Sequence, residues 1–174
     1  YVEMFARDAE RMIDLRKRGG ITRVPVLDLP INTFWDIGNS DGCAVWFHQE
    51  LRGEDRFIDY YEAHGENLRH YVAYLQNRGY LFGTHFLPHD ADTAMLGEEV
   101  ETPHQILAAL GMQNIKVVPR VQHISAGIEV TRKELMGNHW IDRHRPDESK
   151  GEDRGAGNGI RCLDGYQYEW NDKL

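Results

Sequence analysis

The sequence predicts one α/β domain built on a mixed β-sheet, in which three antiparallel strands precede two parallel strands and helices flank the sheet. Three observations predict this fold class. The 174-residue chain, 41% hydrophobic, is long enough for a single sizeable core. Three strand-like runs follow one another with only short turns between them. After them, segments of helical periodicity alternate with short apolar runs, as expected for parallel strands joined by helical crossovers.

The first three strands are predicted at residues 31–37, 43–51 and 55–63. They are rich in β-branched and aromatic residues, and the connecting segments GNSDG and RGED consist of turn formers. Because both connections are short, the simplest arrangement is an antiparallel meander.

A helix is predicted at 66–79, where apolar residues recur at i, i+3, i+4 and i+7 and Gly79 closes the segment. The run YLFGTHFLPHD predicts a fourth strand that ends at Pro88. A right-handed crossover through this helix places the fourth strand parallel to the first and beside it.

Thr102, Pro103 and Gln105 form a capping box with proline at the first helical position, which predicts a second helix that ends at Gly111. The run at 115–119 predicts a fifth strand. Ser125 is placed as the cap of a third helix that carries Ile128, Leu135 and Met136.

The two ends of the chain differ from its centre in composition and in predicted structure. Residues 1–23 predict a surface linker helix, and the domain proper is assigned to 24–174. Residues 142–159 have almost no apolar content and predict a mobile loop. Helical spacing resumes through Ile160, Leu163 and Trp170. A first residue Tyr1 suggests a piece of a longer protein.

The formal net charge of −8 argues against a simple electrostatic nucleic-acid binder, because phosphate binding depends largely on Lys and Arg. A protein that meets DNA through metal ions or while tethered to a partner escapes that objection. Two cysteines without CxxC spacing favour a reducing, cytoplasmic setting. No apolar run approaches the roughly 18 residues of a membrane span, and the N-terminus lacks a signal-peptide core, so a soluble, unsecreted protein with no membrane partner is expected.

Two acids define the candidate site. Asp36 lies among strand-forming residues in TFWDIG, and Asp90 directly follows the fourth strand. If the first and fourth strands are parallel neighbours, both carboxylates stand near the same end of the sheet, where ligands of α/β sheets bind. Two close carboxylates repel each other unless a cation lies between them. Mg²⁺ or Mn²⁺ prefers such oxygen ligands and suits phosphodiester chemistry, including a two-metal mechanism.

Other polar residues have an ordinary alternative beside the functional one. Asp41 could face the site or simply form the turn, and Asp92 and Glu62 fit solvated or turn roles. His89 could orient a water molecule or contact phosphate, or lie free on the surface. A zinc site built from His85, His89 and Asp90 is disfavoured, because two histidines at this spacing converge on a helix and not on a strand.

Basic and aromatic residues also have an ordinary structural role as an alternative to a functional one. Arg120, Arg132 and Lys133 are candidate contacts for a DNA backbone, with solvated side chains as the alternative. The aromatic run IDYYE fits core and sheet face better than a base-stacking platform.

Several of these stretches, in this order, resemble the C-terminal nuclease domain of the large subunit of tailed-phage terminases. The resemblance covers most of residues 24–174. It is carried by WDIG, IDYYE, LPHD, TPHQILAALG, VVPR, GIEVTRKEL and YQYEWNDKL.

The resemblance implies an RNase H-like, RuvC-like fold and a metal-dependent endonuclease that cuts concatemeric viral DNA during packaging. Asp36 and Asp90 match the family's metal-binding, catalytic aspartates. The implied partners are double-stranded viral DNA, the portal protein, the small terminase subunit and an ATPase domain of the same polypeptide. The implied location is the bacterial host cytoplasm, transiently at the procapsid portal.

The ATPase phosphate loop GxxxxGK[ST] does not occur in this sequence. The family usually supplies a third acid after the segment resembling YQYEWNDKL, and that acid is expected beyond Leu174. Two alternatives stay open: a catalytically silent docking module for DNA or the portal, and another RNase H-like nuclease of the resolvase or transposase type.

Overall fold

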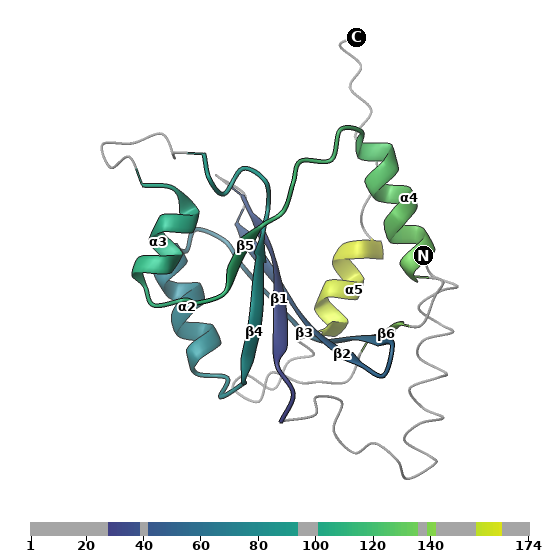
Figure 1. The fold of residues 1–174 in the computed structure, drawn as a ribbon, viewed down its shortest axis with the longest axis horizontal. Coiled ribbons are helices and arrows are strands. Elements are labelled where there is room, and N and C mark those ends of the chain that lie inside the picture. The colour runs from purple at the N-terminus through teal and green to yellow at the C-terminus, as the bar shows by residue number, and fades with distance from the viewer. Residues whose placement is uncertain (1–27, 39–41, 94–100, 136–138, 142–155, 165–174) are drawn as a thin grey trace.

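Six strands form a single mixed sheet at the centre of the molecule (Figure 1). The computed structural model describes residues 28–38, 42–93, 101–135, 139–141 and 156–164. The strands are β1 (Ile31–Ile37), β2 (Cys43–Leu51), β3 (Glu54–Ala63), β4 (Phe82–Leu87), β5 (Ile115–Val117) and β6 (His139–Ile141). The helices are α2 (Leu68–Gln76), α3 (Pro103–Ala109), α4 (Ile124–Leu135) and α5 (Ala156–Asp164).

The strand order is β5-β4-β1-β2-β3-β6. Strands β1, β2 and β3 form the predicted antiparallel meander, while β4 lies parallel to β1 and β5 parallel to β4. The predicted mixed α/β sheet is therefore confirmed, and it agrees with an RNase H-like fold. The carboxyl ends of β1 and β4 consequently lie next to each other.

The larger hydrophobic core lies between the sheet and helices α2 and α3, which share one side of it (Figure 1). Alternate residues of β1 point into this core, and Ile31, Thr33 and Trp35 are all buried. Helix α2 contributes Tyr71, Val72 and Leu75, as its apolar spacing predicted. Helix α3 begins with the predicted capping box, in which Thr102 and Gln105 satisfy each other's backbone N–H groups.

A smaller core lies on the opposite side of the sheet, beneath α5 (Figure 1). Ile141, Ala156 and Ile160 are buried there and pack against Trp46 and Phe57. This second core fixes α5 over β2 and β3. The half of that face formed by β1, β4 and β5 carries no such cluster among the described residues.

Some predictions need correction. Residues 156–159 belong to α5 and not to a loop, because the small residues Ala156 and Gly159 allow the helix to pack closely on the sheet. Ser125 lies inside α4 and does not cap it. Strand β6 was not predicted, since three residues are too few for a periodic signal.

Other predictions lie outside the described residues, namely the linker helix at 1–23, the loop at 142–155 and the segment around Trp170. Among the described helices, none is long and apolar enough to cross a membrane.

Candidate metal centre at the strand ends

Asp36 is the next-to-last residue of β1, and its side chain is exposed. The alternation of the strand buries Thr33 and Trp35 and turns Asp36 to the opposite face, the one that carries α5. The chain turns immediately afterwards, and Gly38 N–H donates to the carbonyl oxygen of Gly42 at 3.0 Å. A Cβ on Gly38 would lie 2.4 Å from that oxygen, so this tight turn requires glycine.

Asp90 follows β4 within a turn that is fixed to helix α3. Ala91 N–H donates to the Pro88 carbonyl at 3.0 Å, and Thr93 N–H donates to the Asp90 carbonyl at 2.8 Å. Ala91 is buried, and its own carbonyl accepts from His104 N–H at 3.0 Å. The backbone under Asp90 is thus held on both sides while its carboxylate stays exposed.

The register of β1 and β4 brings the two acids to one edge of the sheet. Thr33 pairs with His85 and Phe34 with Phe86, so the same register places Asp36 level with Pro88, two residues before Asp90. Neighbouring strands lie about 4.8 Å apart, which puts the two backbones within reach of a shared ion. The register therefore places the backbones of Asp36 and Asp90 at the same edge of the sheet, and a shared metal ion at these residues stays a prediction.

These two residues fit a hard divalent cation in the chemistry of their donors. Both offer carboxylate oxygens on an exposed sheet edge, the ligands that Mg²⁺ and Mn²⁺ prefer, and both ions keep several waters. Within the described part of the chain, no three His, Cys, Asp or Glu side chains come together as a metal site. Asp41, between β1 and β2 in the sequence, lies outside the described residues.

The pKa of the Cys43 thiol is affected by the negative charge of Asp36. Burial raises the pKa of Cys43 to about 12, and the negative charge of Asp36 acts in the same direction. Cys43 lies opposite Ile37 at the start of β2 and is 6% exposed. This thiol is consequently protonated and unreactive at neutral pH.

A buried chain of hydrogen bonds ties β1 to β4 below the two acids. Trp35 Nε1–H donates to Thr33 Oγ1 at 2.8 Å, and Thr33 Oγ1 lies 2.7 Å from His85 Nδ1. Since an indole can only donate, Thr33 Oγ1 accepts the bond from Trp35; it donates to Nδ1 when the imidazole proton is on Nε2 and accepts when that proton is on Nδ1. Burial lowers the pKa of His85 to about 4, in agreement with a neutral ring.

The zinc alternative does not match this geometry. His85 is buried and engaged with Thr33, whereas His89 and Asp90 are exposed beyond the strand. His85 is therefore a structural residue that supports the strand ends.

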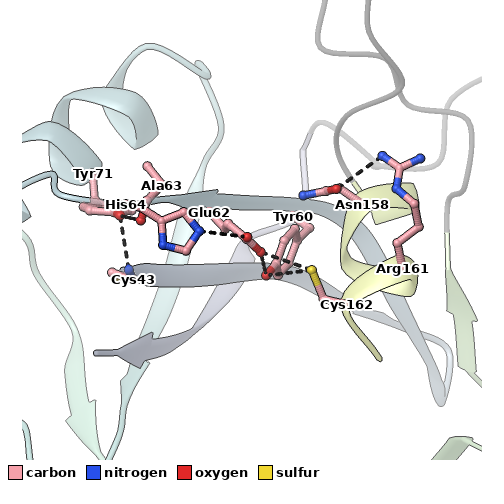
Figure 2. A network of polar contacts seen from close by, with 9 residues as sticks. All are labelled: Cys43, Tyr60, Glu62, Ala63, His64, Tyr71, Asn158, Arg161 and Cys162. Atoms are coloured by element: carbon pink, nitrogen blue, oxygen red, sulfur yellow. Dashed lines mark hydrogen bonds and ion pairs between the residues drawn. The ribbon is translucent and has the colours of Figure 1, made fainter. Parts of the chain in front are cut away.

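Glu62 anchors α5 to the sheet, a role that the sequence did not reveal (Figure 2). Its carboxylate accepts hydrogen bonds from Tyr60 Oη and, at 3.1 Å, from Cys162 Sγ, and it lies 3.5 Å from His64 Nε2. The Tyr60 bond is the main reason that the pKa of Glu62 is lowered. Burial and the bond to Glu62 raise the pKa of both Tyr60 and Cys162, so both groups remain donors.

Glu62 also shares a row of the sheet with Asp36. Asp36 pairs with Ala44, and Ala44 pairs with Glu62, so the three residues face the same side. In the sequence, only the antiparallel register of the meander indicated that Asp36 and Glu62 face the same side. The network around Glu62 thus lies two strands away from Asp36.

The remaining candidates are dispersed. Asp92 Oδ1 lies 2.8 Å from His104 Nδ1, and Asp59 of the IDYYE run is buried with its carboxylate 2.8 Å from Arg78 Nη2, as the core interpretation of that run predicted. Arg120 and Lys133 are exposed, and the side chain of Arg132 is not among those that the structure describes.

A pocket of about 520 Å³ opens beside the carboxyl end of β1, but on the face covered by α2 and α3. Gly38, Cys43, Asn67, Ile106 and Leu110 are among the residues that line it. Neither Asp36 nor Asp90 lines this pocket, so we do not assign it to the metal centre.

Comparison with solved structures identifies the fold. The nuclease domain of the large terminase of bacteriophage SPP1, solved with bound Mn, matches with a TM-score of 0.54 and 14% identity over 88% of this chain and 76% of that one. No model of a known protein family matches the sequence, and neither does any curated protein. At this identity the match shows a shared fold: the chain has the fold of a large-terminase nuclease domain.

Two further matches have lower TM-scores. The nuclease of the large terminase of thermophilic phage G20c, with bound zinc, gives 0.48 and 17% identity over 85% of this chain and 77% of that one. The large terminase of another thermophilic bacteriophage gives 0.48 and 13% identity over 70% of this chain. This chain spans 31% of the length of that protein.

Proposed function

We propose that this chain is the nuclease domain of a viral terminase large subunit, a metal-dependent endonuclease that cuts concatemeric DNA during genome packaging. The observation that carries the proposal is the pair Asp36 and Asp90 at the ends of neighbouring parallel strands. The shared fold with the SPP1 nuclease domain, itself solved with bound Mn, supports it.

In this proposal Asp36 and Asp90 hold Mg²⁺ or Mn²⁺. When bound, such ions activate a water nucleophile and stabilise the leaving oxygen of a phosphodiester, in a two-metal arrangement if both positions are filled. The chain contributes rigid placement of the two carboxylates. Thr33 and His85 fix the register of the strands, and the turn at Asp90 is fixed to α3.

Double-stranded viral DNA and an ATPase domain of the same polypeptide are the partners that this function requires. We extend the proposal to the portal protein and the small terminase subunit, and to the bacterial host cytoplasm with a transient stay at the procapsid portal. Pull-down of portal protein from infected-cell extract by the immobilised domain would test the first of these.

Incubation of supercoiled plasmid with the protein and Mn²⁺ tests the nuclease proposal. We expect cleavage that falls by at least about 100-fold in Asp36→Asn and in Asp90→Asn, because each change removes a charged ligand. Asp92→Asn is the matched control, since that acid lies two residues from Asp90 but pairs with His104. Its cleavage rate should stay near that of the wild type.

Cleavage that survives both ligand substitutions would reject the assignment of these residues. A wild-type protein that binds duplex DNA but never cuts it would favour the docking module. Preferential cutting of branched DNA would favour a resolvase or transposase relative.

A further inference from the structure

Five residues form one row across the sheet, next to the row that contains Asp36. Lys116 of β5 pairs with Phe86 of β4, Phe86 pairs with Phe34 of β1, and the row continues through Trp46 of β2 to Tyr60 of β3. Paired residues in a sheet point to the same face, which here is the face that carries α5. One row thus runs from the edge of the sheet to the helix.

Helix α5 covers only one end of this row. A Cβ on Gly159 would lie 2.3 Å from the Trp46 ring, and Tyr60 is 6% exposed beside Cys162. At the other end Phe34 is 38% exposed and Lys116 is exposed. Phe34, Phe86 and Lys116 form the uncovered part, which we call the open strip.

The side chains of the open strip are held in place by one another. The rings of Phe34 and Phe86 are stacked with centroids 4.9 Å apart and an interplanar angle of 9°. Lys116 Nζ lies 5.8 Å from the centroid of Phe86, over the ring. The rings of His48 and Phe34 form a T-shaped pair, with centroids 5.5 Å apart. Both faces of the Phe86 ring are therefore occupied, and its edge is what the surface presents.

Within the described part of the chain, the cations of this region have no acidic partners. Neither Lys116 nor Arg120, which follows β5, forms an ion pair with an acid of the described residues, in contrast to Arg56 and Arg78. A protein with a formal net charge of −8 repels a polyanion over most of its surface. Local positive charge beside the metal centre is then the simplest way to hold DNA there.

We propose that the open strip binds the sugar–phosphate backbone of duplex DNA, with the edges of Phe34 and Phe86 against deoxyribose and Lys116 on a phosphate. Arg120 extends the same contact. The proposal rests on the proposed nuclease function and adds to it the surface that seats the substrate. Because Lys116 lies two strands from β1, about 10 Å away, a phosphate held there leaves its neighbours within reach of Asp36.

We do not propose base stacking on Phe86, because a base needs an open ring face and both faces of this ring are occupied. Backbone contact also predicts binding without sequence preference. Both consequences distinguish this surface from a base-reading one.

Fluorescence anisotropy of a labelled duplex oligonucleotide, titrated in Ca²⁺ at several salt concentrations, tests the proposal on the whole chain. Lys116→Gln should weaken binding several-fold and reduce the slope of log K against log salt by about 0.9, the value for one phosphate contact. Lys116→Arg should retain the affinity and the salt slope of the wild type. Phe34→Ala should weaken binding with the slope unchanged, since it removes apolar contact and no charge.

Arg69→Gln is the matched charge control, because Arg69 is exposed in the first turn of α2 on the opposite face of the sheet. It should leave affinity and slope unchanged. An unchanged slope in Lys116→Gln, an equal change in Arg69→Gln, or a wild type that binds no duplex at all would each overturn the proposal.

Two results separate this proposal from the nuclease function. If Lys116→Gln binds DNA as the wild type does while the wild type cuts plasmid in Mn²⁺, the open strip is wrong and the nuclease stands. If the slope changes as expected but no metal-dependent cleavage occurs, the strip stands as a DNA contact and the nuclease assignment fails.

Discussion

At the scale of single residues, His85 and Thr33 determine how the strand ends are held. The pair lies 2.7 Å apart in a buried position, where an unpaired imidazole or hydroxyl would lose its hydrogen bonds to water. The interaction joins β1 and β4, the two strands that carry Asp36 and Asp90. His85, which is not a proposed metal ligand, therefore supports the two strands that carry the candidate metal centre.

This burial makes the stability of the fold depend on pH. The folded-state pKa of His85 is lowered to about 4 from 6.5, so the unfolded chain binds the proton first as pH falls. The stability from the neutral ring is fully present above pH 6.5 and is lost between there and pH 4, by up to about 3 kcal/mol. Urea unfolding across this range should show the loss, and His85→Gln should flatten it.

His89→Gln is the control for that measurement, because the His89 side chain is exposed just beyond the same strand. It should keep the wild-type pH dependence. An equal flattening in both variants would mean that His85 is not the responsible group.

At the scale of secondary structure, Gly127 of α4 and Gly159 of α5 illustrate opposite constraints. Gly159 of α5 lies against Trp46, and a Cβ there would come within 2.3–2.9 Å of three ring atoms. Gly127 of α4 has nothing within 4 Å of its Cβ position. Gly159 permits close packing of α5 on the sheet. Gly127 makes no such close contact, so its main effect on stability is its low helix propensity.

Substitution by alanine should therefore act in opposite directions at these positions. Gly159→Ala should destabilise the protein by about 1–3 kcal/mol, because the ring is enclosed by Phe57 and Tyr60 and cannot move freely. Gly127→Ala should stabilise it by up to about 1 kcal/mol. Chemical denaturation of both variants measures this, and a stabilising Gly159→Ala would contradict the close packing of α5.

At the scale of the whole molecule, charge and function are linked. In the proposed metal centre, two carboxylates of an acidic domain stand at one sheet edge, where a bound divalent ion would neutralise their negative charge. Binding of the ion to the folded state alone then stabilises the fold in proportion to its occupancy. The effect can be measured without DNA or cleavage.

We expect Mn²⁺ at about 100 times its Kd to stabilise the wild-type protein by about 2.7 kcal/mol and EDTA to reverse the effect. Asp36→Asn should abolish the gain, because the remaining carboxylate binds the ion far more weakly. Differential scanning fluorimetry with and without Mn²⁺ gives the shift. Glu66→Gln, an exposed acid that precedes α2 and lies near His70, should keep it; loss of the shift there would point to non-specific ion binding.

Local patterns in the sequence were sufficient to predict the main helices and strands. The alternation in β1, the spacing in α2 and the capping box of α3 each involve neighbours within a few residues, and all three agree with the structure. The parallel pairing of β1 and β4 followed from the handedness of crossovers. The sequence could thus place Asp36 and Asp90 at the ends of neighbouring parallel strands, while their role as metal ligands stays a prediction.

Contacts between distant residues were decided only by the tertiary structure. Cys162 and Glu62 are 100 positions apart, and β6 and α5 form only because the far face of the sheet offers Trp46 and Phe57 as a surface to bury. Such pairs leave no periodic signal, since the free energy that fixes them comes from burial against remote partners. For the same reason, the open strip of Phe34, Phe86 and Lys116 became visible only once three separate strands lay side by side.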